Sequence, residues 1–162
     1  MEMSADDVVA ILDRLEGAGL RVWVDGGWAI DAVVGRQTRP HDDLDLVVRR
    51  DEVSAVEREL AGLGYVRAGG TPPMSFESID VEGRQVDSHP IAADGTYLMR
   101  DGETWRYPLP ERETPGVIGD RCVRCLDVGT QLVCHTGYEP LDLDRHRHDI
   151  ALLESLRRWS SR

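Results

Sequence analysis

The stretch from residue 21 to residue 48 constrains the fold of this chain more than any other part of its sequence. It begins with RVWVD, which alternates polar and apolar residues as a short strand does. Gly26 and Gly27 interrupt this strand, and residues 28–34 have the composition of a short helix that ends at Gly35. A loop then leads to DLDLVV, a second strand pattern. This order of elements predicts an α+β protein with helices packed on a mixed β-sheet.

The rest of the chain contains the same mixture of helices and strands. Residues 4–15 carry apolar side chains at helical spacing with Ser4 as the N-cap, and Asp51 is the predicted cap of another helix. The Glu-Gly pair at 82–83 is typical of a hairpin turn. Residues 92–119 are rich in Gly, Pro, Asp and aromatic side chains and show no clear period. The other predicted elements are, in chain order, a helix to residue 60, strands at 65–68, 74–81, 84–91 and 121–126, and helices at 128–135 and 143–159.

The length of 162 residues is typical of one domain with a buried core. We therefore expect a single domain over residues 1–162, in which residues 127–162 form a C-terminal helical part. Hydrophobic residues make up 41% of the chain and charged residues 30%, as in an ordinary globular protein. Three cysteines, an odd number, do not indicate a disulfide framework, and the acidic start MEMSADD lacks the features of a signal peptide. These features predict a cytoplasmic protein.

The balance of charge restricts the partners of this protein. Nineteen Lys and Arg residues against 30 Asp and Glu residues give a net charge of −11. Such a surface repels a phosphate backbone, which disfavours a general nucleic-acid binder, whereas it tolerates a small cationic molecule. No apolar run approaches the length that a membrane helix needs. We expect neither nucleic acid nor a membrane as a partner.

Two carboxylates on one predicted strand are the first candidates for chemistry. Alternate side chains of a strand share a face, so Asp43 and Asp45 project together while the leucines between and after them face the core. A cation relieves the repulsion of such a pair, and Mg²⁺ prefers carboxylate oxygens together with substrate phosphates and water. In QVDSHP, the side chains of Gln85, Asp87 and His89 also share a face. If that strand lies beside the first, Asp87 adds a third carboxylate, and the three can hold two metal ions or one ion and a general base.

The glycine turn strengthens this hypothesis. Gly26 and Gly27 allow a ligand to approach the backbone closely, and the helix that follows directs free N–H groups at an anion. Each part has a simpler explanation when taken alone, because a D-x-D pair can face solvent on a half-exposed strand and Gly-Gly can form an ordinary tight turn. A glycine turn, a helix and then paired aspartates are a rarer combination, which places a phosphate site beside a metal site.

These residues resemble those of a known superfamily. A Gly-Gly pair, a D-x-D pair and a later single Asp form the pattern of the DNA-polymerase-β-like nucleotidyltransferases. Within it, WVDGGWAIDAVVGRQTRPHDDLDL is similar to the small antibiotic adenylyltransferases, and the tail VRCLDVGTQLVCHTGYEP, followed by DRHRHDIALL, is more similar to the lincosamide branch than to the aminoglycoside 2″ branch. The resemblance implies the nucleotidyltransferase fold and the transfer of AMP from ATP to a hydroxyl of a small cationic antibiotic, with two Mg²⁺ ions.

The resemblance also implies roles for the residues that match the motifs. Asp43 and Asp45 would be metal ligands, and Asp87 would be a ligand or the base for the attacking hydroxyl. Asp42 is interpreted as structural. Asp149 is interpreted as part of the solvated start of the last helix, with a reach back to the site as the less favoured alternative. The remaining implied contacts are Gly26 and Gly27 around the triphosphate, Arg39 and His41 on phosphates, and His135 and Tyr138 in the acceptor pocket, where a buried structural histidine is an equal alternative for His135.

A zinc site is an alternative use of the cysteines. Cys122 and Cys125 form a C-x-x-C, with Cys134 and His135 nearby. A tetrahedral site needs four ligands, and no second C-x-x-C supplies them. Buried apolar cysteines are therefore the preferred interpretation.

Several functions remain open from the sequence. The acceptor is a lincosamide-type antibiotic or, as the second choice, an aminoglycoside. A nucleotidyltransferase of the toxin–antitoxin kind, which modifies a protein, would have the same motifs. A non-catalytic nucleotide-binding module is disfavoured, because it has no use for three adjacent carboxylates. A cleft in so small a domain is shallow, so a homodimer that completes the acceptor pocket is a further hypothesis.

Overall fold

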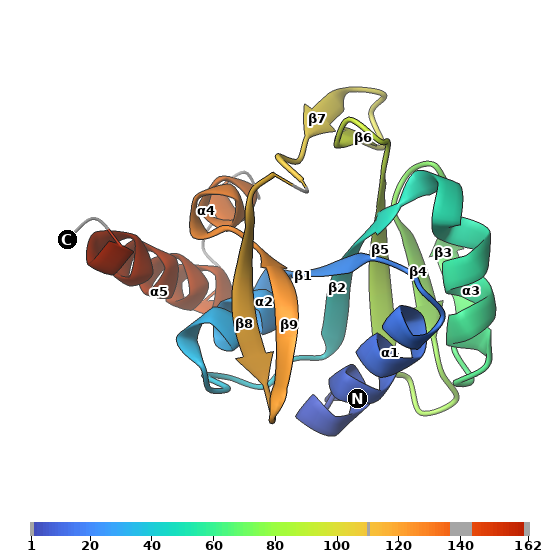
Figure 1. The fold of residues 1–162 in the computed structure, drawn as a ribbon, viewed down its shortest axis with the longest axis horizontal. Coiled ribbons are helices and arrows are strands. Elements are labelled where there is room, and N and C mark those ends of the chain that lie inside the picture. The colour runs from blue at the N-terminus through green and yellow to red at the C-terminus, as the bar shows by residue number, and fades with distance from the viewer. Residues whose placement is uncertain (1, 110, 137–143, 161–162) are drawn as a thin grey trace.

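The structure is a computed structural model that describes residues 2–109, 111–136 and 144–160. A mixed sheet forms its centre, and helices pack against it (Figure 1). The helices are α1 (Ala5–Gly17), α2 (Gly26–Val34), α3 (Val53–Ala61), α4 (Val128–Thr136) and α5 (Asp144–Ser160). The strands are β1 (Val22–Asp25), β2 (Asp43–Arg49), β3 (Val66–Gly70), β4 (Phe76–Ile79), β5 (Gln85–Ile91), β6 (Thr96–Leu98), β7 (Thr104–Arg106), β8 (Glu113–Ile118) and β9 (Arg121–Leu126). This arrangement confirms the α+β fold class.

The strand order of the main sheet is β3-β4-β5-β2-β1-β9-β8, and the β6-β7 hairpin pairs with the end of β5. Strands β2 and β5 run parallel, as do β1 and β9, whereas β1 and β2 are antiparallel. The carboxyl end of β1 and the amino ends of β2 and β5 therefore meet at one edge. The strands that carry Asp45 and Asp87 are neighbours, as the metal hypothesis requires.

Alternation along the central strands gives the two faces of the sheet different partners. Helices α1, α2 and α3 pack on the face that carries Val24, Leu44 and Leu46. A smaller apolar cluster, which includes Trp23 and Val47, lies on the opposite face with Tyr107 and Leu109 from the segment after β7. Asp25 follows Trp23 by two residues, and Asp45 precedes Val47 by two. Both carboxylates therefore lie on the face away from α1 and α3.

Local sequence signals explain where the helices begin and end. Ser4 forms a capping box with Asp7 at the start of α1, as predicted. Gly35 ends α2 in the left-handed conformation, with φ of 82°. The prediction that Asp51 caps the next helix is wrong: a 3₁₀ turn (Arg50–Glu52) comes first, and α3 starts at Val53 without a side-chain cap.

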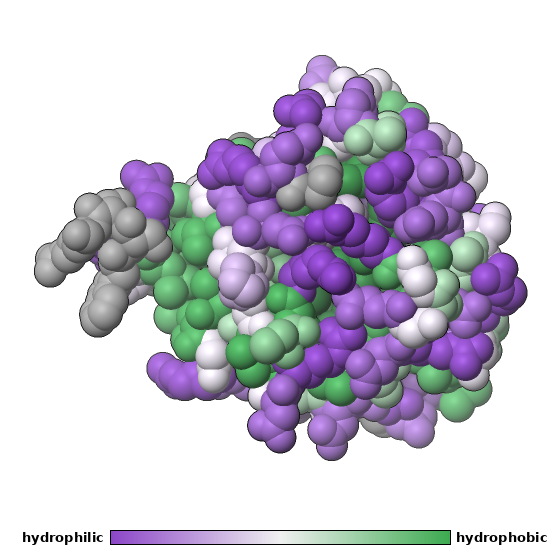
Figure 2. Space-filling model, in the orientation of Figure 1, coloured by the Kyte–Doolittle hydropathy of each residue, from purple (hydrophilic) through white to green (hydrophobic). Residues whose placement is uncertain are grey.

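Residues 92–119, which showed no clear period, contain β6, β7 and β8. Strands β6 and β7 have only three residues each, too few to display an alternation in the sequence. The surface in the view of Figure 2 is largely hydrophilic, as the abundance of charged residues leads one to expect. In the described part of the chain, no helix is long and apolar enough to cross a membrane.

Candidate active site

Three neighbouring strands bring carboxylates into one row. In the strand register, Asp45 lies opposite Asp25 on β1 and opposite Asp87 on β5. Asp43 lies two residues before Asp45 on the same side of β2, opposite Gln85. The sequence predicted the two carboxylates of β2 and, on the condition that the strands are neighbours, that of β5. It did not identify Asp25, although this residue directly precedes the glycine pair.

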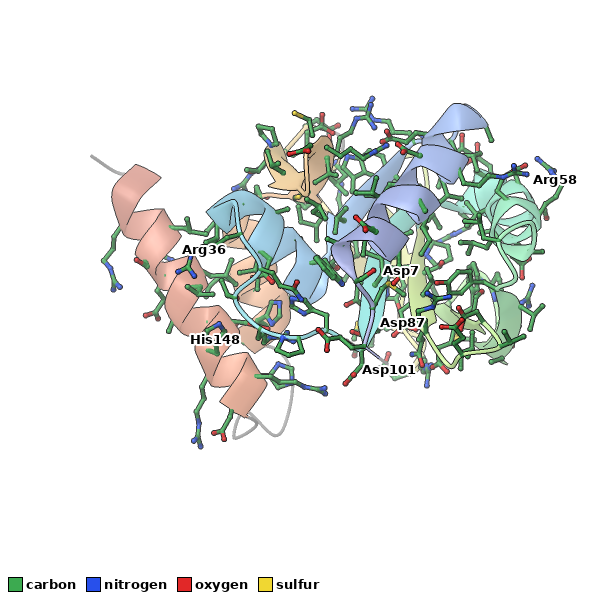
Figure 3. The ribbon with its side chains drawn as sticks, turned by 90° about the horizontal axis from the view of Figure 1, so that it is seen from below. Asp7, Arg36, Arg58, Asp87, Asp101 and His148 are labelled. Atoms are coloured by element: carbon green, nitrogen blue, oxygen red, sulfur yellow. The ribbon has the colours of Figure 1, made fainter. Side chains whose placement is uncertain are left out.

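A cavity of about 420 Å³ opens above this row. It is bounded by the glycine turn, the start of β2, the middle of β5, the end of α4 and the first two turns of α5. Figure 3 shows Asp87 in the sheet and His148 on α5. The lining residues are Asp25, Gly26, Gly27, Arg39, Pro40, Asp42, Asp43, Asp45, Asp87, Cys134, His135, Arg145, His146 and Asp149.

Burial and mutual repulsion perturb the carboxylates of the cavity. Burial and the charge of Asp45 raise the pKa of Asp25 to about 6. Burial and the charges of Asp45 and Asp43 raise the pKa of Asp87 to about 6. The pKa of Asp43 is also raised, by burial and by Asp45. A cation among these carboxylates would stabilise their ionised forms.

His89 is a basic side chain that faces the carboxylate row. Its Nε2 lies 3.3 Å from Asp45 Oδ1. Burial lowers the pKa of His89, but the hydrogen bond to Asp45 and the charges of Asp45, Asp25 and Asp87 outweigh this effect and raise it. The sequence placed His89 on the same face as Asp87 but gave it no role.

The donor set fits a hard divalent cation. Asp43, Asp45 and Asp87 offer carboxylate oxygens on adjacent strands, the chemistry that Mg²⁺ prefers. Within residues 2–109, 111–136 and 144–160, no three His, Cys, Asp or Glu side chains are arranged to hold an ion as they stand. Asp45 instead faces His89, and Asp87 Oδ1 accepts a hydrogen bond of 2.8 Å from Gln85 Nε2.

Both glycines of the turn are required by what packs against them. Gly26 has a φ of 62°, and a Cβ on it would overlap the carboxylate of Asp45. A Cβ on Gly27 would overlap the ring of His41 and would lie 2.6 Å from Arg39 Nη2. Asp25 caps α2, because its Oδ1 accepts a hydrogen bond of 2.7 Å from the Gly26 N–H. The first turn of α2 is thus open to the cavity only because side chains are absent there.

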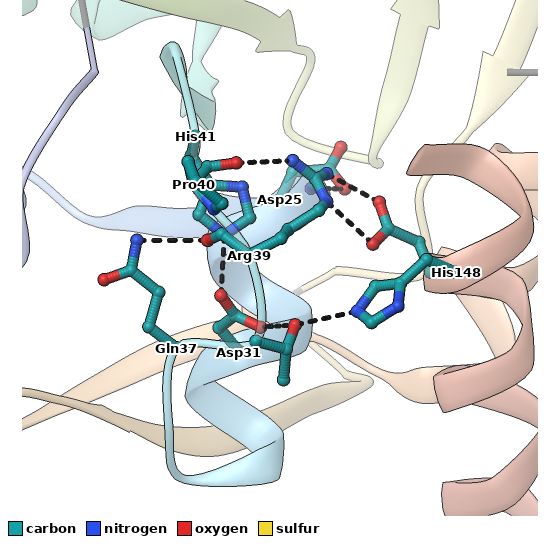
Figure 4. Close-up of polar contacts among 10 residues, drawn as sticks. Asp25, Asp31, Gln37, Arg39, Pro40, His41 and His148 are labelled. Atoms are coloured by element: carbon teal, nitrogen blue, oxygen red, sulfur yellow. Dashed lines mark hydrogen bonds and ion pairs between the residues drawn. The ribbon is translucent and has the colours of Figure 1, made fainter. Parts of the chain in front are cut away.

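His41 lies elsewhere than the resemblance implied. Its side chain is only 2% exposed, and its Nε2 lies 2.6 Å from Asp31 Oδ2 on α2 (Figure 4). The ring also packs against Trp28, with 4.8 Å between the ring centroids. His41 does not line the cavity, so its expected contact with phosphates is corrected to a supporting role behind Gly27.

The loop after α2 places Arg39 in the cavity wall. Its guanidinium pairs with Asp149, which is buried and also lines the cavity. The interpretation of Asp149 as part of a solvated helix start is therefore wrong. Asp42, interpreted as structural, is exposed and lines the same cavity.

On the acceptor side, His135 of α4 lines the cavity, whereas Tyr138 lies outside the described residues. Burial and the neighbouring His146 lower the pKa of His135, although Asp149 opposes them. Cys125 is buried, Cys122 is exposed, and burial raises the pKa of the Cys125 thiol to about 12. The two cysteines of the C-x-x-C thus have different surroundings, and only Cys125 fits the interpretation of a buried apolar cysteine.

Solved structures with this fold define the class of protein. The lincomycin-bound lincosamide adenylyltransferase LnuA matches with a TM-score of 0.82 and 26% identity over 96% of this chain and 99% of its own. ANT(2'')-Ia in complex with adenylyl-2''-tobramycin matches with a TM-score of 0.74 and 28% identity over 94% of this chain and 88% of its own. The chain is therefore an enzyme of the nucleotidyltransferase class with the fold of the antibiotic adenylyltransferases.

Sequence comparison narrows the class to a family. The profile of the aminoglycoside-2''-adenylyltransferases matches residues 7–153, and the chain belongs to this family. A lincosamide resistance protein of Staphylococcus haemolyticus is 30% identical over 90% of this chain and 91% of its own length. A 2''-aminoglycoside nucleotidyltransferase of Klebsiella pneumoniae is 47% identical over 123 residues, 71% of this chain but only 63% of its own length.

Proposed function

We propose that this protein transfers AMP from ATP to a hydroxyl of a small antibiotic of the lincosamide type, with Mg²⁺. The observation that carries the proposal is the convergence of Asp43, Asp45 and Asp87 from adjacent strands on one cavity beside the Gly26-Gly27 turn. Adenylyl transfer needs these two features together, a carboxylate site for cations and a backbone site for phosphates.

In this proposal Asp43, Asp45 and Asp87 would hold the metal ions, which would supply positive charge where negative charge develops on oxygen. The Gly26-Gly27 turn lies against the triphosphate: the Gly26 N–H donates to Asp25 Oδ1, so the N–H groups from Gly27 onward bind the phosphates. Arg39 contacts phosphate oxygens from the cavity wall.

The chemical step is an in-line displacement at phosphorus. The acceptor oxygen forms a bond to the α-phosphorus as the bond from that phosphorus to the bridging oxygen of pyrophosphate breaks. Asp87, which lies opposite Asp45 on the neighbouring strand, takes the proton of the acceptor hydroxyl. The protein contributes positioning and charge rather than a covalent intermediate.

The extent of similarity supports a lincosamide-type acceptor. The lincosamide relatives align over nearly their full length, with 91% and 99% of their chains covered. The chain spans less than two thirds of the aminoglycoside enzymes it matches in sequence. A specific observation favours an aminoglycoside as the second candidate, because the highest identity of these relatives, 47%, belongs to an aminoglycoside enzyme. The acidic cavity accommodates the amine of either class.

Mass spectrometry of drugs incubated with the protein, ATP and Mg²⁺ tests the proposal. We expect lincomycin to gain the mass of one AMP, with pyrophosphate released in equal amount. Addition to tobramycin alone would support the second candidate. Modification of neither drug, together with an adenylylated protein band in lysate, would replace the proposal with a protein-modifying enzyme. Asp43→Asn is the matched control for contaminating activity, because it removes a proposed ligand without changing side-chain size.

A further inference from the structure

We infer that Asp149 is a positioning residue, which holds the guanidinium of Arg39 over the first turn of α2 so that it meets the phosphates of the nucleotide. Asp149 lies on α5, 110 residues away in the sequence from the loop it fixes. The inference rests on the proposed nucleotide site and deepens it, because it makes the last helix part of phosphate binding. It assigns to Asp149 an effect through Arg39 rather than direct contact with substrate.

Arg39 and Asp149 form a bidentate pair with the geometry of a fixed fork. Arg39 Nε donates to Asp149 Oδ1 at 3.0 Å, and Arg39 Nη2 donates to Asp149 Oδ2 at 2.7 Å. A third hydrogen bond of 3.0 Å runs from Arg39 Nη1 to the carbonyl of Pro40. Bidentate pairing fixes the plane of a guanidinium as well as its position. The Asp149 side chain is 2% exposed and that of Arg39 is 23% exposed, so water screens the pair little.

The remaining donors of Arg39 are in the right place for an anion. A guanidinium has five N–H groups, and the three bonds above use three of them. One N–H on Nη1 and one on Nη2 are left by these bonds, and Arg39 lines the cavity. Nη2 lies close over Gly27, since a Cβ there would come within 2.6 Å of it. The guanidinium and the first N–H groups of α2 can therefore bind the same phosphate.

The loop that carries Arg39 is attached to α2 by contacts that do not involve the Arg39 guanidinium. Thr38 Oγ1 donates to Asp31 Oδ1 at 2.5 Å, and His41 pairs with the other oxygen of the same carboxylate. These bonds tie the loop to α2 on both sides of Arg39. Loss of Asp149 would release the side chain of Arg39 while the loop itself stays attached, which predicts a defect in nucleotide binding without loss of the fold.

Calorimetric titration with Mg²⁺ and ATP in the absence of any acceptor tests the inference. We expect Asp149→Asn to weaken ATP binding roughly ten- to hundredfold, the effect of one or two charge-assisted hydrogen bonds to phosphate. The KM for the acceptor should stay within twofold of the parent value. Arg39→Lys should weaken ATP binding similarly, and the double variant should be no weaker than Arg39→Lys alone, because both changes remove one function.

A matched control and a second variant keep the test decisive. Glu154→Gln removes one exposed carboxylate from the same helix and should leave ATP binding unchanged. If circular dichroism shows that Asp149→Asn does not fold, Asp149→Glu replaces it, since it keeps the charge and displaces the guanidinium. ATP binding within twofold of the parent in either folded variant, or effects of Arg39→Lys and Asp149→Asn that simply add, would overturn the inference. Failure to modify either drug while ATP still binds would count against the proposed function alone.

Discussion

Substitution of Gly27 by alanine tests how the first turn of α2 is built. The backbone there is helical, so alanine itself causes no strain. Its methyl group would overlap the ring of His41 and lie 2.6 Å from Arg39 Nη2. Neither neighbour can move freely, because His41 is bound to Asp31 and Arg39 is bound to Asp149.

Two opposing effects determine how much Gly27→Ala changes the free energy of unfolding. Alanine in place of a helical glycine stabilises a protein by about 0.4–1 kcal/mol through the unfolded chain. Overpacking against side chains that are held in place costs about 1–3 kcal/mol. The expected result is a net destabilisation of about 1–2 kcal/mol, which lowers the melting temperature by roughly 2–8 °C for a chain of this size. Gly17→Ala is the control, because nothing lies within 4 Å of its Cβ position, and it should be neutral or stabilising.

Urea denaturation measures the stability of both variants, and calorimetric titration with Mg²⁺ and ATP measures binding. We expect Gly27→Ala to lose at least tenfold in ATP affinity, a loss of about 1.4 kcal/mol or more, since the methyl group displaces Arg39 and covers the first N–H groups of α2. Gly17→Ala should bind ATP as the parent does. Unchanged ATP binding by a folded Gly27→Ala variant would show that this turn is not the phosphate site, whatever happens to stability.

Other substitutions test the carboxylate row and the support behind the turn. Asp43→Asn or Asp45→Asn should abolish pyrophosphate release in a coupled assay, and Asp43→Asn should leave the melting temperature equal or higher because it removes repulsion; substantial turnover in either folded variant would rule out their role as metal ligands. Asp31→Asn keeps the size of the side chain but removes the charge to which His41 and Thr38 are bonded, and it should cost about 1.5–3 kcal/mol in urea denaturation; a loss below about 0.5 kcal/mol would contradict the importance of these bonds. Although burial opposes it, hydrogen bonds from His41 and Thr38 lower the pKa of Asp31 below its ordinary value of 3.8. As the pH falls, the unfolded state therefore binds a proton at Asp31 before the folded state does. The stability of the parent over Asp31→Asn should be fully present above pH 3.8 and be lost as the pH falls further. A stability difference that does not change with pH would refute the lowered pKa of Asp31.

The faces of the strands could be predicted from the sequence because they depend only on local alternation. Leu44 and Leu46 are buried while Asp43 and Asp45 remain half-exposed, as the D-x-D pattern indicates. The proximity of Asp87 could be stated only as a condition, since it depends on which strands pair. After β2 the chain runs to the edge strand β3 and returns through β4 to β5, which then lies beside β2, and no local pattern specifies such an order.

The roles of single polar residues were less predictable for the same reason. His41 and Arg39 stand two residues apart in one loop, yet the first points into the protein and the second lines the cavity. Asp149 lies in an R-H-R-H-D run that resembles a solvated helix start, and its partner is 110 residues away. A charged side chain must be either paired or solvated, but the sequence around it does not indicate which of the two occurs.

The charge of the cavity constrains how a nucleotide can enter it. Asp43, Asp45 and Asp87 face the space where the triphosphate would lie, and without cations they would repel it. Asp149 contributes little to this repulsion because Arg39 neutralises it. Divalent ions on the three carboxylates would reverse the sign of the local field, so that ATP binding should depend on Mg²⁺ even before any chemistry occurs. The same acidic wall favours an acceptor that carries an amine, which is the property that both candidate drug classes share.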